Sequence, residues 1–185
     1  ERLLRLRGAP EDSARAFELL STKARDNLGE RARRYTDACG KQIAASAMAL
    51  SRAQSRHGTK SALFAPELGI ARAWRLFTIG DWPAAIAATR GAARMAARGG
   101  QYAIAVRVWH ESARLGDRRA ADGIASIAGQ VPCAYTDMAR AHARALTAGD
   151  AAGLADAAAR LAAAGFSGAA ADAARQADDA APLLP

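Results

Sequence analysis

The chain has 185 residues, a formal net charge of +8 and an aromatic content of only 5%. Alanine is its most frequent residue; because alanine is the best helix former and a poor strand former, the composition favours an all-α protein and disfavours a β-sheet fold. No apolar run is long enough to span a membrane, and Cys39 and Cys133 match no metal-ligand spacing, so we expect reduced cysteines in a cytoplasmic protein.

Residues 1–60 are predicted to form an N-terminal helical pair that continues an array lying upstream. Pro10 suits the first turn of a helix, and Gly29 ends that helix. A second, longer helix is expected to run to about His57. Since the chain begins at Glu1 rather than at methionine, we expect either a processed product or, preferably, a fragment of a longer protein.

Residues 61–185 are predicted to form three helical hairpins and a closing helix. The dipeptide Gly-Asp recurs at spacings of 36 and 33 residues, each time between two alanine-rich stretches. Glycine can end a helix at positive φ, and aspartate can cap the next helix. A period of roughly 34 residues is typical of stacked helix–turn–helix repeats. The expected helices are 66–79 with 82–98, 101–115 with 118–129 and 133–148 with 151–164, joined at Gly80-Asp81, Gly116-Asp117 and Gly149-Asp150, and then 167–180.

The hairpins resemble the tetratricopeptide family, in which small residues occupy the positions where the two helices of a repeat cross. The first hairpin matches this pattern well, and an aromatic residue follows its corner, as in the family. The second hairpin has a tryptophan at one crossing position, and the third has larger residues at all of them. The crossing residues are Ala73, Ala85 and Ala92 with Trp82 after the corner, then Trp109, Ala121 and Ala128, then His142, Leu154 and Leu161. The resemblance implies antiparallel helical hairpins stacked as a right-handed solenoid.

A second resemblance covers more of the chain. The stretch Trp-His-Glu-Ser-Ala-Arg-Leu-Gly-Asp at 109–117, the stretch Ala-His-Ala-Arg-Ala-Leu at 141–146 and the closing helix after Gly165 are similar to a region of large actinobacterial LuxR-type transcriptional regulators. In those proteins a helical repeat array lies between an ATPase module and a helix-turn-helix. The resemblance implies a sensor or interaction segment whose ATP-binding and DNA-binding parts lie outside this chain.

The sequence contains no pattern that indicates an enzyme. Gly40-Lys41 is followed by Gln42 and lacks the earlier glycine of a phosphate-binding loop. The three histidines and two cysteines show no metal-ligand spacing, and Ser167 lacks the strand–turn–helix setting of a hydrolase nucleophile. We therefore expect no catalytic residues, no metal and no cofactor.

The candidate binding residues lie on the first helices of two hairpins. Trp74 and His110 each stand six residues before a Gly-Asp corner, an offset that faces the concave groove in the tetratricopeptide family. Phe77, Ser112 and Arg114 lie on nearby turns of the same helices. An aromatic ring, an imidazole and a guanidinium on one wall would suit a peptide, a protein segment or a small anionic effector. The alternative for each residue is packing within the array.

Two other functions remain open from the sequence. One is a stand-alone tetratricopeptide-like scaffold that binds peptide tails; for any of these functions the chain could form a homodimer. The other is direct nucleic-acid contact through residues 1–60, which carry thirteen lysines and arginines against seven acidic residues. Their cluster Arg31-Ala-Arg33-Arg34 could contact phosphates, although a solvated helix face is the preferred explanation.

Overall fold

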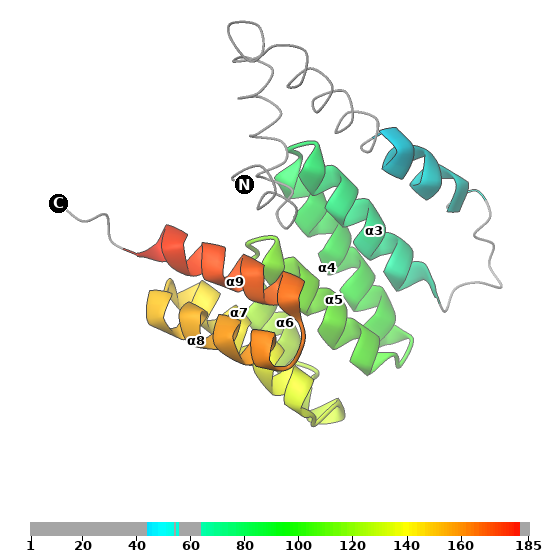
Figure 1. The fold of residues 1–185 in the computed structure, drawn as a ribbon. Helices are drawn as coiled ribbons and strands as arrows, with labels where there is room; N and C mark the ends of the chain where they lie inside the picture. Colours follow the sequence, from blue (N-terminus) through cyan, green and yellow to red (C-terminus); the bar gives the residue numbers. More distant parts are fainter. Residues whose placement is uncertain (1–43, 54, 56–63, 182–185) are drawn as a thin grey trace, which may run out of the picture. The chain divides into compact units, whose positions relative to one another are not determined.

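The computed structural model describes residues 44–53, 55 and 64–181, and all regular secondary structure in these residues is helical (Figure 1). The prediction of an all-α fold is thereby confirmed. The chain divides into two units, residues 1–85 and 86–185, and the boundary falls within a helix. The predicted helix that begins at Pro10 and the cluster Arg31-Ala-Arg33-Arg34 lie outside the described residues.

The first unit contains a helical segment at 44–53, helix α3 (Ala65–Thr78) and the first turn of α4 (Trp82–Arg98). Helix α3 begins with Pro66 in its first turn, where the missing N–H costs nothing. Its buried face carries Ile70, Ala73 and Phe77, at the three- and four-residue spacing of an amphipathic helix. The bounds of α3 lie one residue from those predicted.

The first Gly-Asp corner has the predicted geometry. Gly80 adopts a φ of 81°, and its N–H donates to the Phe77 carbonyl at 3.0 Å. The N–H of Asp81 donates to the Leu76 carbonyl at 2.9 Å, so the corner also satisfies the last carbonyls of α3. The Asp81 carboxylate accepts the N–H of Ala84 at 3.2 Å, which caps the start of α4.

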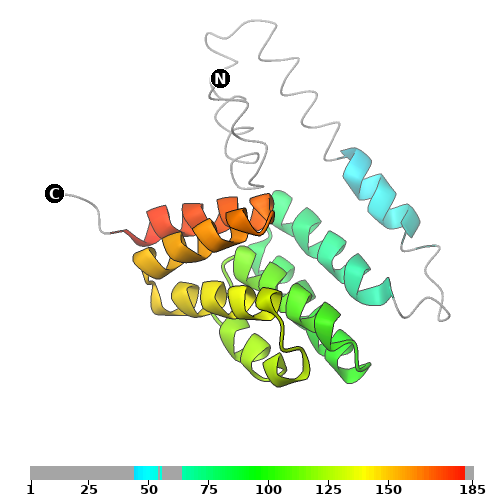
Figure 2. The ribbon, with the colours of Figure 1, turned by 60° about the horizontal axis from the view of Figure 1, so that its bottom comes forward.

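The second unit contains the rest of α4 and five further α-helices (Figure 2). Helix α5 packs against α6, α7 and α9, and α8 packs against both α7 and α9. Five of the predicted helices end within a residue or two of their predicted bounds, but the predicted helix 118–129 is shorter and broken. The elements are α5 (Tyr102–Arg114), α6 (Ala120–Ala125), the 3-10 turn η3 (Ala128–Gln130), α7 (Ala134–Ala148), α8 (Ala151–Ala163) and α9 (Ser167–Ala180).

The other two corners differ in the role of their aspartate. Gly116 and Gly149 both have positive φ, 89° and 66°, as predicted. Asp150 caps α8 by accepting the N–H of Gly153 at 3.0 Å. Asp117, however, is buried, and α6 begins only at Ala120. Its carboxylate accepts the N–H of Arg119, the residue before α6, at 2.9 Å, so it binds one N–H at the start of the helix as predicted. The same carboxylate also binds side chains of α4 and α5, which the sequence did not predict.

The size of Trp109 at a crossing position is matched by the smallness of Gly123 on α6. Trp109 is buried, and a Cβ atom added to Gly123 would lie 2.4 Å from two atoms of its indole ring. Such a contact is far below van der Waals distance, so α6 can approach α5 only because residue 123 is glycine. Trp109 on α5 and the missing side chain of Gly123 on α6 together allow the two helices to pack closely.

Gly123→Ala is expected to destabilise the chain by about 1–3 kcal/mol, because the added methyl group would push α6 away from Trp109. The matched control is Gly91→Ala on α4, where nothing lies within 4 Å of the added Cβ. This control should stabilise by about 0.5–1 kcal/mol through helix propensity alone. Urea unfolding followed by circular dichroism measures both, and equal effects would disprove the steric account.

Candidate functional site

The interior of the second unit contains several polar side chains. Such groups are costly to bury unless they are hydrogen-bonded. Most of them form three clusters that join α4, α5, α7 and α9. The buried polar residues are Thr89, His110, Ser112, Asp117, Thr136, His142, Asp172 and Gln176.

The first cluster, the histidine network, consists of Tyr135, His110, His142 and Gln176. His110 lies on α5, His142 on α7 and Gln176 on α9, at spacings of 32 and 34 residues, close to the repeat period. His110 Nδ1 lies 2.9 Å from the Tyr135 hydroxyl, and His110 Nε2 lies 3.0 Å from His142 Nδ1. His142 Nε2 lies 2.7 Å from Gln176 Oε1. The network thus links α5, α7 and α9, which alternate with α6 and α8 along the chain, side chain to side chain.

The hydrogen bonds of Gln176 assign the tautomers of both histidines. Gln176 Nε2 donates to the carbonyl oxygens of Ala113 and Arg114, at 2.9 and 3.1 Å. Its Oε1 must therefore accept from His142 Nε2–H. If both rings are neutral, His142 Nδ1 is then an acceptor for His110 Nε2–H, and His110 Nδ1 accepts from the Tyr135 hydroxyl. The neutral network thus has one direction, and Gln176 also caps the C-terminal end of α5.

Burial fixes the charge state of this network. Burial, with smaller contributions from His142 and Arg114, lowers the pKa of His110 to about 3. The pKa of His142 is also lowered, chiefly by burial, against the opposing hydrogen bond to Gln176. Burial raises the pKa of Tyr135 to about 12, and the Glu111 charge adds to this. All three rings are consequently neutral at neutral pH, in agreement with the assigned hydrogen bonds.

The second cluster joins α5 to α9 through charged groups. Arg114 Nε donates to Asp172 at 2.7 Å, and its Nη1 donates to both carboxylate oxygens of Glu111, at 2.9 and 2.8 Å. Arg175 Nη2 lies 3.7 Å from the other Asp172 oxygen. Burial raises the pKa of Asp172 although Arg114 opposes the shift. Asp172 and Gln176 stand four residues apart, so one face of α9 carries both polar contacts to α5.

The third cluster surrounds Asp117. Arg90 from α4 binds both carboxylate oxygens of Asp117, with its Nε at 2.7 Å. Ser112 donates to the carboxylate at 2.8 Å and accepts from Thr89 at 2.9 Å, and the N–H of Arg119 donates at 2.9 Å. Burial alone would raise the pKa of Asp117, but these hydrogen bonds outweigh it and lower the pKa. The second corner is thus tied to α4.

The structure separates the predicted binding residues between the two units. Trp74 and Phe77 lie in the first unit, with their ring centroids 5.8 Å apart in an edge-to-face arrangement; Trp74 is half-buried and Phe77 is buried. His110, Ser112 and Arg114 lie in the second unit. His110 and Ser112 are buried with their polar atoms engaged, and Arg114 is half-buried in its ion pairs. Their contact with a ligand stays a prediction.

Sequence reasoning missed the central member of the histidine network. The sequence analysis places His142 at a crossing position of the third hairpin and gives it no polar partner. The available signal was its polarity, because an imidazole at a position normally filled by a small apolar residue requires a buried partner. Asp172 and Gln176 gave a similar signal, since they interrupt the alanine face of α9.

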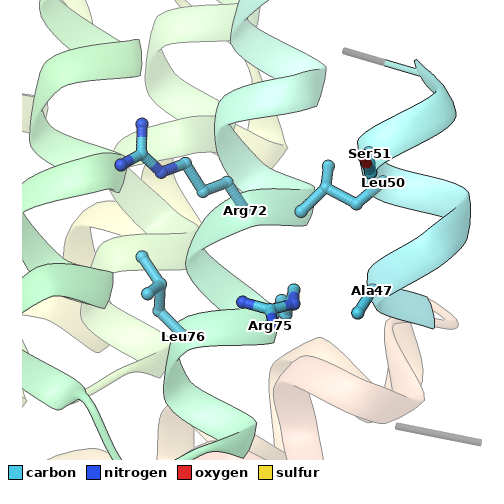
Figure 3. A pocket seen from close by; sticks show the side chains of 6 residues that line it. All are labelled: Ala47, Leu50, Ser51, Arg72, Arg75 and Leu76. Atoms are coloured by element: carbon cyan, nitrogen blue, oxygen red, sulfur yellow. The ribbon is translucent and has the colours of Figure 1, made fainter. Parts of the chain in front are cut away.

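A cavity of about 500 Å³ lies in the first unit, between the helical segment 44–53 and α3 (Figure 3). The segment contributes two apolar residues and a hydroxyl, and α3 contributes two guanidinium groups and an apolar residue. The lining residues are Ala47, Leu50, Ser51, Arg72, Arg75 and Leu76.

The described side chains bring no three His, Cys, Asp or Glu residues together as a metal site. Within the same residues, no helix combines the length and the apolar character needed to cross a lipid bilayer. Comparison of the chain with family models, with curated proteins and with solved structures gives no match.

Proposed function

We propose that this chain is the helical-repeat sensor or interaction region of a LuxR-type bacterial transcriptional regulator. It would bind a protein segment or a small effector and relay that event to a DNA-binding module outside the chain. In this proposal the hairpins stack as a tetratricopeptide-like solenoid, and no part of the chain is an enzyme. The carrying observation is the repeated corner: positive-φ glycines at 80, 116 and 149, each followed by an aspartate and each lying between two helices.

The polar clusters support a relay mechanism. In a simple solenoid each repeat touches only its neighbours, but here Asp172 and Gln176 of α9 bind the end of α5, about sixty residues earlier. A ligand that favours one arrangement of α5 would therefore change the position of α9 directly. Population shift between two arrangements requires such a difference in contacts between the two states.

The test uses the complete protein that contains this chain. Gln176→Ala removes the hydrogen bonds to His142 and to the end of α5, and it should change the affinity for operator DNA at least threefold. Arg140→Ala, which removes an exposed ion pair with Asp137, should leave the affinity unchanged. Anisotropy of labelled DNA measures both. A gene without a helix-turn-helix region, or equal affinities for the two variants, would contradict the proposal.

The two alternatives predict other outcomes. A stand-alone scaffold would bind peptide tails and have no DNA-binding module in the same gene. Direct nucleic-acid binding would give the chain affinity for random duplex DNA that falls steeply between about 50 and 200 mM salt. The excess of basic over acidic residues in 1–60 is the observation behind this alternative. Anisotropy of a labelled random duplex, measured at both salt concentrations, tests it.

A further inference from the structure

We propose that the cavity between the helical segment 44–53 and α3 binds a small organic anion with an apolar body. The anionic group would pair with Arg72 and Arg75, and the apolar body would contact Leu50 and Leu76. This inference rests on the proposed sensor function, because it names the chemical class of the effector. The binding itself is measurable on this chain alone.

The charge of the cavity is the first argument. Arg72 and Arg75 stand three residues apart on α3, so their side chains leave neighbouring turns of the same helix. Neither forms an ion pair within the described part of the chain, and none of the six lining residues is acidic. Two guanidinium groups can bind a carboxylate or a phosphate through charge-assisted hydrogen bonds. The cavity therefore selects an anion.

The apolar lining is the second argument. Figure 3 shows Leu50 pointing from the helical segment toward α3, with Ala47 one turn away on the same segment. Leu50 and Leu76 are half-buried, so a hydrocarbon body placed between them would remove further apolar surface from water. Ser51 adds one hydroxyl for a polar atom of the ligand. Inorganic phosphate would satisfy the arginines but leave this lining unfilled.

The size of the cavity is the third argument. Its volume of about 500 Å³ falls within the range of roughly 300–1,000 Å³ typical of small-molecule sites. A metabolite-sized acid fits this space. A fatty acid and an alkyl phosphate both combine an anionic group with an apolar chain. The experiment below compares their affinities.

The experiment measures binding of octanoate, octyl phosphate, octanol and inorganic phosphate to the chain 1–185 by calorimetry. We expect one or both of the octyl anions to bind at least tenfold more tightly than octanol and inorganic phosphate. The ratio of octanoate to octyl phosphate affinity identifies the preferred anionic group. Failure of both octyl anions to bind, or equal binding of octanol, would overturn the proposal.

Two variants localise the site. Arg72→Ala/Arg75→Ala should weaken binding of the octyl anion at least tenfold. The matched control is Arg94→Ala/Arg98→Ala, which removes the same charge from two exposed arginines of α4 and should change binding less than twofold. Circular dichroism of both variants checks that they keep the helical content of the unsubstituted chain. Equal losses in the two variants would show general charge attraction and would overturn the site.

A third variant tests the apolar contact. Leu50→Ser should weaken binding of the octyl anion severalfold without changing that of inorganic phosphate, and an unchanged octyl affinity would overturn the apolar part of the proposal. The regulator function is tested separately, by DNA affinity of the complete protein. If the DNA-affinity test fails, the proposed anion site still stands. If no octyl anion binds, the anion site is wrong, and the regulator function would require a different effector.

Discussion

Arg114→Ala is expected to lower the free energy of unfolding by about 3–5 kcal/mol at pH 7, because it leaves the Asp172 carboxylate buried without its main counter-charge. The Asp172 side chain is 1% exposed, and Arg114 Nε donates to it at 2.7 Å. Arg175 stays 3.7 Å from the other oxygen, so the loss should lie at the lower end of this range. Urea unfolding followed by circular dichroism measures it.

Two further variants separate this buried ion pair from an ordinary one. Arg140→Ala also removes an arginine bonded to an acid three residues earlier, but that pair is exposed, so it should cost less than about 0.5 kcal/mol. Asp172→Asn in the Arg114→Ala background removes the unpaired charge and should recover part of the stability. If Arg114→Ala lowers the free energy of unfolding no more than Arg140→Ala does, the ion pair between Arg114 and Asp172 does not stabilise the packing of α5 against α9.

The helices of residues 64–181 could be predicted because their signals are local. Positive-φ glycines and alanine-rich faces act within one or two turns, and they place the bounds of α3, α4, α5, α7, α8 and α9 within about two residues. The exception is the predicted helix 118–129. There the side chain of Asp117 turns into the core to meet Arg90, so α6 starts late, and a 3-10 turn follows it.

The polar clusters could not be predicted because they depend on contacts between distant residues. A helical period marks Asp172 and Gln176 as lying on the buried face of α9, but it does not say which groups they meet. Their partners on α5 are 58 and 63 residues away in the sequence. The same holds for the candidate residue His110, whose partner on α7 is 32 residues away. Periodicity placed it on a helix face but could not distinguish a groove from the core.

Lowering the pH from 7 to 5 is expected to destabilise the second unit by about 2 kcal/mol through His110 alone. In the unfolded chain its pKa returns to about 6.5, whereas burial lowers it to about 3 in the folded chain. Between these values only the unfolded state takes up the proton, so stability is full above pH 6.5 and falls by about 1.4 kcal/mol per pH unit below it. The lowered pKa of His142 adds a loss of the same sign.

The hydrogen bonds explain why the folded state resists this proton. A proton on His142 Nδ1 would face the N–H of His110 Nε2, and a proton on His110 Nδ1 would reverse the Tyr135 bond. Arg114 also opposes a positive ring. The raised pKa of Asp172 contributes with the opposite sign, between the ordinary pKa of that carboxyl and its raised value.

His110→Gln tests the assignment through the slope of stability against pH, which is independent of the stability that the substitution itself removes. Urea unfolding at pH 7, 6 and 5 should give a slope smaller by up to about 1.4 kcal/mol per pH unit than that of the unsubstituted chain. His57→Gln changes the only histidine outside the network and serves as the control. An unchanged slope in His110→Gln would mean that His110 takes up its proton equally in both states, and the neutral, one-directional network would then be wrong.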